Sequence, residues 1–266
     1  MIDRLVREKE EAVRSNGAPH LSHSRINRYL LCPEQYRLYY IEGMRPRFYS
    51  ASLVFGQTVH QALSSLFKTG ANPMETFTTL WHDSRPFELR YSARESWEKL
   101  RETGRELLAK FVLEEIPRIS AVSGSEKPFE FGITDIESPF VGVIDLVAVV
   151  DGKKTVVDFK TSGSTYAEHE ARLSDQLTAY QLAEPDAEQM ALCVLVKTKE
   201  PKIEWHICGR NPDDLLDYLA KAKYVAREIT SERFFKRPGM WCSWCDFLPV
   251  CLRDARKTAE TLVRVN

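Results

Sequence analysis

The segment PFVGVIDLVAVVDGKKTVVDFKTS, residues 139–162, decides the fold of this 266-residue chain. It contains two runs rich in valine and isoleucine, and the dipeptide Asp151-Gly152 separates them. Such a dipeptide between two strand-like runs is typical of the tight turn in a β-hairpin. The segment therefore predicts a pair of antiparallel strands in the middle of the chain.

Three charged side chains interrupt these apolar runs. Asp145 lies inside the first run, and Asp158 and Lys160 lie near the end of the second. Because side chains alternate along a strand, Asp158 and Lys160 are expected on one face and Phe159 on the other, and a hairpin can bring Asp145 beside the pair. Burial of such charges is costly unless they pair or bind a metal. The hairpin alone leaves two interpretations open: a structural ion pair, or a functional site.

Length and composition limit the class of protein. A chain of 266 residues suffices for one large domain or two small ones, and 43% hydrophobic residues is ordinary for a globular protein. With a formal net charge of −1, any contact with nucleic acid must come from a local patch. The charged N-terminal segment lacks the apolar core of a signal peptide and no apolar run has membrane-spanning length, so we expect a cytoplasmic location without a membrane partner.

Periodicity elsewhere predicts helices on either side of further strands. Helices are expected at 22–31, around 36–40, and at 52–70, 73–82, 93–116, 171–184 and 212–230, with strands at 127–136, 190–198 and 202–209. This order predicts an α/β fold in which helices flank a central mixed sheet. Residues 1–20 are expected to form a tail and residues 21–266 one domain, with a helical insertion at about 72–127.

Arginines and tyrosines are interleaved in the first two helical segments. Arg25 and Arg28 lie among Tyr36, Tyr39 and Tyr40. Such a pattern can grip a phosphate backbone and stack bases. Equally, the tyrosines can belong to the core and the arginines to a solvated face, so both alternatives stay open.

Other polar side chains allow a functional and a structural interpretation. His60 falls in the middle of a predicted helix, where a lone histidine is usually a hydrogen-bonded core residue. Gln176 and Tyr180 are four residues apart and share a helix face, which surface polarity alone can explain. Glu130 lies at the edge of a predicted strand, where a glutamate is most often exposed.

Three of the six cysteines are close together near the C-terminus. Cys242, Cys245 and Cys251 form a C-x2-C-x5-C pattern. In a cytoplasmic protein, cysteines more often bind metals or lie in the core than form disulfides. Three at this spacing, with aromatic neighbours to exclude solvent, indicate a soft-metal site.

A fourth ligand for such a site has one main candidate. Cys32 precedes a proline between two predicted helices, whereas Cys193 and Cys208 lie in strand-like runs that already explain them as core residues. Four thiolates also suit zinc, so a zinc-ribbon-like binding protein is an alternative.

Six stretches of the chain resemble a known family. They are SHSRINRYLLCPEQYRLYY, GQTVHQAL, GVIDLV, VVDFKTS, QLTAYQLA and WCSWCDFLPVC, in that order between residues 22 and 251. Together they resemble the RecB-like branch of the PD-(D/E)XK nuclease superfamily. Within it, the chain is similar to members with a four-cysteine iron–sulfur cluster, such as CRISPR-associated RecB-like exonucleases and the AddB nuclease domain. The resemblance implies a restriction-endonuclease-like sheet and an iron–sulfur lobe formed by residues at about 21–50 and 236–256.

The resemblance implies roles for the charged residues of the hairpin. Asp145, Asp158 and His60 would be ligands of Mg²⁺ or Mn²⁺, because carboxylates and such hard ions suit one another. The main-chain carbonyl of Phe159 would be a further ligand. Lys160 would position or activate the attacking water.

It also implies roles outside the hairpin. Gln176 and Tyr180 would line the site and contact DNA, together with Arg25 and Arg28, and Glu130 lies where some relatives carry a further acidic residue. A 4Fe–4S cluster would be held by four cysteines: Cys32, Cys242, Cys245 and Cys251.

The function implied is metal-dependent hydrolysis of DNA phosphodiester bonds. The expected activity is that of an exonuclease on single-stranded or frayed DNA ends, in DNA repair, recombination or phage DNA processing. A CRISPR adaptation nuclease that trims new spacers is one alternative, and a catalytically inactive DNA-binding subunit is another. Helicase, recombination or CRISPR adaptation proteins would be the corresponding partners.

Overall fold

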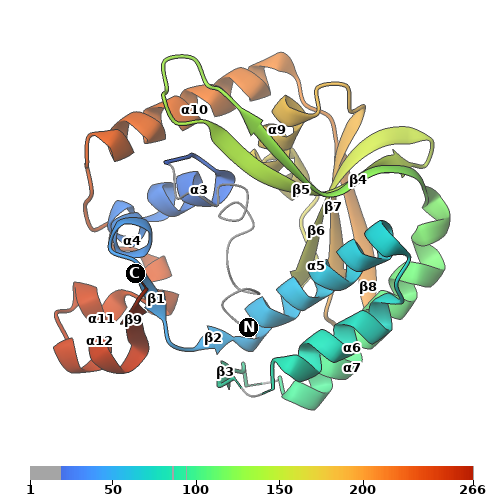
Figure 1. The fold of residues 1–266 in the computed structure, drawn as a ribbon, viewed down its shortest axis with the longest axis horizontal. Coiled ribbons are helices and arrows are strands. Elements are labelled where there is room, and N and C mark those ends of the chain that lie inside the picture. The colour runs from blue at the N-terminus through green and yellow to red at the C-terminus, as the bar shows by residue number, and fades with distance from the viewer. Residues whose placement is uncertain (1–18, 86, 94, 266) are drawn as a thin grey trace.

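A five-stranded mixed sheet forms the centre of the computed structural model, which describes residues 19–85, 87–93 and 95–265 (Figure 1). The strands are β4 (Ile119–Phe131), β5 (Phe140–Val150), β6 (Lys153–Ser162), β7 (Gln189–Val196) and β8 (Lys202–Cys208), paired in that order. β6 and β7 are parallel, and the other neighbours are antiparallel. The predicted mixed α/β architecture is confirmed, whereas most of the expected tail, residues 1–20, lies outside the described residues.

The predicted hairpin is present as β5 and β6. Asp151 and Gly152 at its turn have φ angles of 49° and 82°, as a tight hairpin turn with two left-handed positions requires. The strands pair from Val150 opposite Lys153 to Leu146 opposite Val157, and there the pairing ends. β5 continues beside β4 alone, so the two hairpin strands part at the position that Asp145 and Asp158 occupy.

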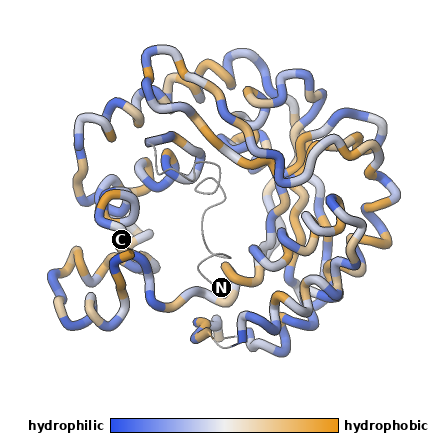
Figure 2. The backbone as a smooth tube through the Cα atoms, viewed as in Figure 1, coloured by the Kyte–Doolittle hydropathy of each residue, from blue (hydrophilic) through white to orange (hydrophobic). Residues whose placement is uncertain are grey.

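Three long helices cover one face of the sheet: α5 (Ala51–Thr69), α6 (Pro73–Asp83) and α7 (Trp97–Glu114). Their apolar sides pack with residues such as Leu146, Val157 and Phe159, and Figure 2 shows hydrophobic residues along the central strands and this layer. α5 comes close to β6, because a Cβ added at Gly56 would lie 2.9 Å from Thr161 Oγ1. The long helix that carries His60 therefore runs directly over the end of the hairpin.

The expected helical stretch 72–127 needs correction. It holds α6, the two-residue strand β3 (Leu89–Arg90), α7 and the 3-10 turn η2 (Ile116–Arg118), but β4 already begins at Ile119. Residues 119–127 lack a helical repeat of apolar residues, and their backbone pairs with β5 across an irregularity between Ser120 and Gly124.

The opposite face is covered by α8 (His169–Arg172), α9 (Asp175–Ala183) and α10 (Pro212–Thr230). One helix was expected at 171–184, but the structure divides it into α8 and α9. Two sets of hydrogen bonds divide it: the Ser174 side chain accepts from the amide of Leu177 and begins α9, and Arg210, distant in the sequence, donates to the carbonyls of Ala171 and Ser174.

The two ends of the chain meet in a small terminal lobe. It contains α3 (His23–Leu31), α4 (Pro33–Tyr36), the π-helical η1 (Arg37–Ile41), β1 (Met44–Pro46), η3 (Met240–Trp244), α11 (Leu248–Cys251), α12 (Ala255–Thr261) and β9 (Leu262–Arg264). β1 pairs with β9, and Figure 1 shows α11 and α12 beside them. The short strand β2 (Tyr49–Ser50) leads from this lobe into α5. Among the described helices, none combines the length and apolar character needed to cross a membrane.

Candidate active site

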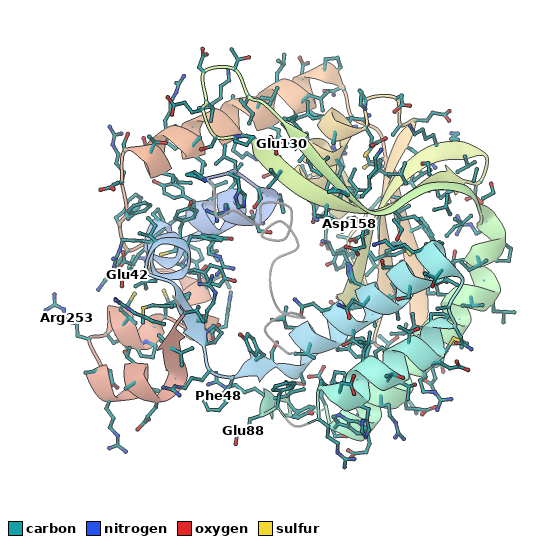
Figure 3. The ribbon with its side chains drawn as sticks, in the orientation of Figure 1. Glu42, Phe48, Glu88, Glu130, Asp158 and Arg253 are labelled. Carbon is teal, nitrogen blue, oxygen red and sulfur yellow. The ribbon has the colours of Figure 1, made fainter. Side chains whose placement is uncertain are left out.

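The candidate site lies where β5 and β6 part. The separation leaves backbone groups without their usual partners in the sheet, and side chains replace those partners. The amide of Phe159 donates to Asp145 Oδ2 at 2.9 Å, and the Tyr180 hydroxyl donates to the carbonyl of Val143 at 2.9 Å. Asp145 is 5% exposed and Asp158 is 1% exposed, so two carboxyl groups are buried at this point of the sheet. Figure 3 marks the position of Asp158.

His60 approaches the carboxylates from α5. Its Nδ1 lies 3.3 Å from Asp145 Oδ2, and its ring meets Phe159 edge to face. Phe159 in turn packs against Phe67 and Phe111 in the layer of long helices. As expected, Phe159 and Lys160 point to opposite faces of β6, because Lys160 reaches the other helical layer.

Lys160 is fixed by a chain of polar contacts. Its Nζ lies 2.7 Å from Asp158 Oδ2 and donates to Gln176 Oε1 at 2.8 Å. Gln176 Nε2 donates to the hydroxyl of Tyr180 at 2.8 Å, which lies 3.4 Å from Asp158 Oδ1. The predicted pair on α9 thus contacts the predicted lysine and carboxylate, and surface polarity alone does not explain it.

The charges in this chain are mutually dependent. Burial raises the pKa of the Asp158 carboxyl, and the Asp145 carboxylate raises it further, although Lys160 acts in the opposite sense. Burial lowers the pKa of Lys160, but the carboxylates of Asp158 and Asp145 outweigh that effect and the net pKa is raised. Lys160 is therefore an ammonium group at neutral pH and serves as a positive charge and hydrogen-bond donor.

The donor set suits a hard divalent cation. Asp158 Oδ2 is buried, and the Lys160 ammonium pairs with it at 2.7 Å. A buried carboxylate oxygen is a ready ligand for a cation. Within the described residues, no group of three or more His, Cys, Asp or Glu side chains is arranged closely enough to hold a metal. His60, Asp145 and Asp158 therefore adjoin one another without forming a closed set of ligands.

A cleft of about 360 Å³ opens beside Lys160 and Gln176. Of its lining residues, sequence reasoning identified Lys160 and Gln176 and missed the others, among them His23 and Asn27 of α3, which are hydrogen-bonded to each other at 3.4 Å. A sequence signal for them existed: they are four residues apart on one face of a helix that buries Ile26 on another. The remaining lining residues come from β6, β7 and the α8–α9 region: Lys160, Tyr166, Glu170, Leu173, Ser174, Asp175, Gln176 and Leu192.

Arg25 and Arg28 lie on the same helix but stack on tyrosines. The guanidinium carbon of Arg25 is 4.2 Å from the ring centroid of Tyr40, and that of Arg28 is 3.6 Å from the ring centroid of Tyr39. Such cation–π contacts stabilise the terminal lobe. Both arginines are half-buried and stand outside the lining of the cleft just described, so their contact with DNA stays a prediction.

Glu130 is exposed on β4, where it pairs with Val141 of β5 (Figure 3). This position agrees with the expected strand edge. The described contacts do not bring it to the carboxylates of the hairpin.

The four cysteines of the predicted cluster all lie in the terminal lobe. Each is half-buried and has a free thiol. Burial raises the pKa of the Cys251 thiol, and nearby Cys245 and Cys32 raise it further. They do not form a closed metal site in the described part of the chain, so the structure does not support the predicted 4Fe–4S cluster.

The two other cysteines lie outside the terminal lobe. Cys193 of β7 is fully buried where the sheet packs against α5, α6 and α7, which confirms it as a core residue. Cys208 is half-buried at the end of β8, where Arg210 donates to its sulfur.

Comparisons with known proteins bear on the fold and the family of the chain. The crystal structure of a "Putative exonuclease" from Eubacterium rectale superposes with a TM-score of 0.54 at 14% sequence identity, covering 91% of this chain and 90% of that one, which shows a shared fold. The crystal structure of SSO0001 has a TM-score of 0.46 at 16% identity, covering 94% of this chain and 95% of that one. No curated protein sequence matches the chain. The model of the PD-(D/E)XK nuclease superfamily matches residues 20–252, and the chain belongs to that superfamily.

Proposed function

We propose that this protein hydrolyses DNA phosphodiester bonds with Mg²⁺ or Mn²⁺, from the ends of single-stranded or frayed DNA. The observation that carries the proposal is the convergence of Asp145, Asp158 and Lys160 where β5 and β6 part, with His60 beside them. Membership of a superfamily of nucleases that generally use divalent metals supports the chemistry. The name of the Eubacterium rectale protein supports the choice of an exonuclease.

The carboxylates of the hairpin have the chemistry to hold the ion. Asp145, Asp158 and the carbonyl of Phe159 would supply oxygen ligands, and His60 would supply a nitrogen. A bound divalent ion supplies a water of lowered pKa and neutralises charge on the scissile phosphate. Because Asp145 already accepts from the Phe159 amide, its carboxylate is oriented before any ion binds.

Lys160 has a separate task. Gln176 and Asp158 fix its ammonium group, and the raised pKa keeps it protonated. It would therefore donate a hydrogen bond to a phosphate oxygen as negative charge develops there, rather than remove a proton from water. Tyr180 fixes the orientation of Gln176 and so restricts the movement of Lys160 indirectly.

The terminal lobe is proposed to carry the 4Fe–4S cluster. The proposal rests on the C-x2-C-x5-C pattern and on Cys32 lying in the same lobe, although the four half-buried thiols do not form a closed metal site in the described residues. Four thiolates would need to approach one another when the cluster binds, as metal binding and local folding are often coupled. No catalytic step depends on the cluster.

The activity is tested with linear single-stranded DNA labelled at either end, a duplex with frayed ends and circular single-stranded DNA. With Mg²⁺ or Mn²⁺, wild-type protein is expected to shorten the linear and frayed substrates and to leave circles intact. Chelation by EDTA should stop the reaction, and Lys160→Ala serves as the catalytic control. Equal cleavage of circles would indicate an endonuclease instead. Tight DNA binding without cleavage under either metal would indicate an inactive DNA-binding subunit.

A further inference from the structure

The cleft beside Lys160 contains hydrogen-bonding groups that the catalytic proposal does not use. His23 and Asn27 line it from α3, and Tyr166 and the α8–α9 turn also contribute to the lining. Its volume of about 360 Å³ is near the lower end of the range for small-molecule sites, roughly 300–1,000 Å³. The cleft therefore suits a single nucleotide unit rather than a duplex.

The charges in the cleft disfavour a phosphate group. Among the lining residues that the structure describes, Lys160 is the one lysine or arginine, and it is already paired with Asp158. Glu170 and Asp175 bring two carboxylates to the lining, although the Lys221 ammonium lies 2.7 Å from Asp175. A second phosphate would meet acidic groups without a new cation, so a neutral part of the nucleotide fits better.

His23 and Asn27 present hydrogen-bonding groups suited to a base. Burial lowers the pKa of His23 to about 4, and the Lys160 ammonium lowers it in the same sense, so the imidazole is neutral at pH 7. A neutral imidazole offers one donor and one acceptor, and a carboxamide offers both kinds of group. Asn27 Nδ2 and His23 Nε2 are hydrogen-bonded to each other at 3.4 Å, so the Asn27 carbonyl oxygen, its second amide hydrogen and His23 Nδ1 are the groups left to pair with the edge of a base.

The wall formed by Tyr166 and the α8–α9 turn supplies apolar surface. Tyr166 is half-buried, and Leu173 on the α8–α9 turn is 74% exposed despite being hydrophobic. Three contacts fix this wall: the Tyr166 amide donates to Glu204, and Arg210 donates to the carbonyls of the turn at both Ala171 and Ser174. A flat base can pack on such surface without regard to its sequence.

We propose that this cleft is a nucleobase subsite, in which His23 and Asn27 hydrogen-bond a base next to the scissile phosphate. Tyr166 and Leu173 pack against the same base. This inference rests on the proposed nuclease function and assigns it a single-stranded substrate, since a base reaches the cleft only when it is unpaired.

The test measures binding with Ca²⁺ in place of Mg²⁺. Fluorescence anisotropy is recorded for single-stranded oligonucleotides that carry one abasic residue at successive positions from each end. For wild-type protein, one position is expected to show an affinity loss of about tenfold, as for one stacked base. His23→Ala and Asn27→Ala should bind unmodified DNA about tenfold more weakly and show no further loss at that position.

Two further variants keep the test decisive. Leu173→Ser changes an exposed side chain and leaves the core intact, so it should reduce the abasic penalty without affecting the fold. His82→Ala, at an exposed position of α6, should retain wild-type affinity and the full penalty. Absence of a position-specific penalty in wild type, or an unchanged penalty in the His23, Asn27 and Leu173 variants, overturns the subsite.

Cleavage in Mg²⁺ is read separately. If wild-type protein shows the abasic penalty but cleaves no unmodified DNA, the subsite proposal stands and the nuclease proposal is contradicted. Wild-type protein that cleaves without any abasic penalty contradicts the subsite alone.

Discussion

The candidate active site and the terminal lobe differ in how their residues are positioned. At the candidate site, Asp145, Asp158, Lys160 and Gln176 are brought into direct or shared contact by the backbone of long strands and helices. In the terminal lobe, Cys32 and Cys245 influence Cys251, but the four cysteines do not form a metal site in the described residues. Residues on long elements are thus placed by the core alone, whereas residues on short segments can depend on their ligand for final geometry.

The difference follows from the amount of packing behind each region. Twenty buried residues form the cluster between the sheet and α5–α7, whereas the cluster beside the three C-terminal cysteines has four, because α3 and α4 of the lobe pack into a separate cluster with α10. The four are Leu38, Met44, Phe247 and Leu262. Such a small core supplies little hydrophobic stabilisation, so a cluster bridging both chain ends would contribute much of the lobe's stability.

The largest expected effect is loss of cleavage on changing the hairpin. Asp158→Ala removes a proposed metal ligand, and Lys160→Ala removes a charge proposed to stabilise the transition state, a kind of loss that typically costs about 100- to 1,000-fold in rate. Each variant should lower single-turnover cleavage at saturating Mg²⁺ by at least that factor. Iron content should not change, because the terminal lobe is separate. Wild-type rates in either variant would remove that residue from the mechanism.

The next largest effect concerns the terminal lobe. Cys32→Ser should lose iron and acid-labile sulfide and should destabilise both chain ends together, while retaining more cleavage activity than Asp158→Ala. Metal and sulfide analysis after anaerobic purification provides the measurement, and Cys208→Ser is the matched control that should keep its iron. Full iron and sulfide in Cys32→Ser would exclude this cysteine as a ligand. A zinc-only wild-type preparation would exclude the cluster.

The hairpin and the faces on which its side chains lie were predictable because they depend on neighbouring residues. Asp151-Gly152 specifies the turn, and strand alternation separates Phe159 from Lys160. The i, i+4 spacing that places Gln176 and Tyr180 on one helix face is equally local. In each case the sequence separation that determines the arrangement is a few residues.

The features that were missed depend on residues far apart in the sequence. α8 and α9 are separate helices because Arg210 hydrogen-bonds to the turn between them from 36 and 39 residues away. His23 reaches the cleft only through packing of α3 against α9 and α10. No periodicity within a single segment contains that information.

Arg210 offers a smaller, graded change in the cleft. It donates to the carbonyls of Ala171 and Ser174 and to Thr178 Oγ1. Its guanidinium group therefore fixes the N-terminus of α9, the helix that carries Gln176. Lysine cannot reproduce those bonds. Arg210→Lys should lower kcat about tenfold with little change in KM. This loss is smaller than the roughly 100-fold cost of misplacing a catalytic group by 1 Å, because Arg210 acts on the site only through α9.

Two measurements separate this positioning role from a general loss of stability. Amide hydrogen exchange in α8 and α9 should increase in Arg210→Lys, while that of β6 stays at the wild-type level. Arg256→Lys, with a side chain 90% exposed on α12, is the matched control and should change neither quantity. Unchanged kcat in Arg210→Lys would show that the α8–α9 turn is held by other contacts.

The smallest effect is a pH dependence of stability at the boundary between the two regions, where α3 meets the cleft. Burial and the Lys160 ammonium lower the pKa of His23 to about 4 from 6.5, so between these values the unfolded chain binds a proton that the folded protein does not. Stability contributed by the neutral imidazole is therefore present above pH 6.5 and is lost as pH falls towards 4. His23→Gln should remove this loss, and the difference in Tm between the two proteins should shift by several degrees over that range. Scanning calorimetry without added metal at intervals from pH 7.5 to 4.5 provides the measurement. A constant difference across the range would place the His23 ring in solvent, outside the cleft.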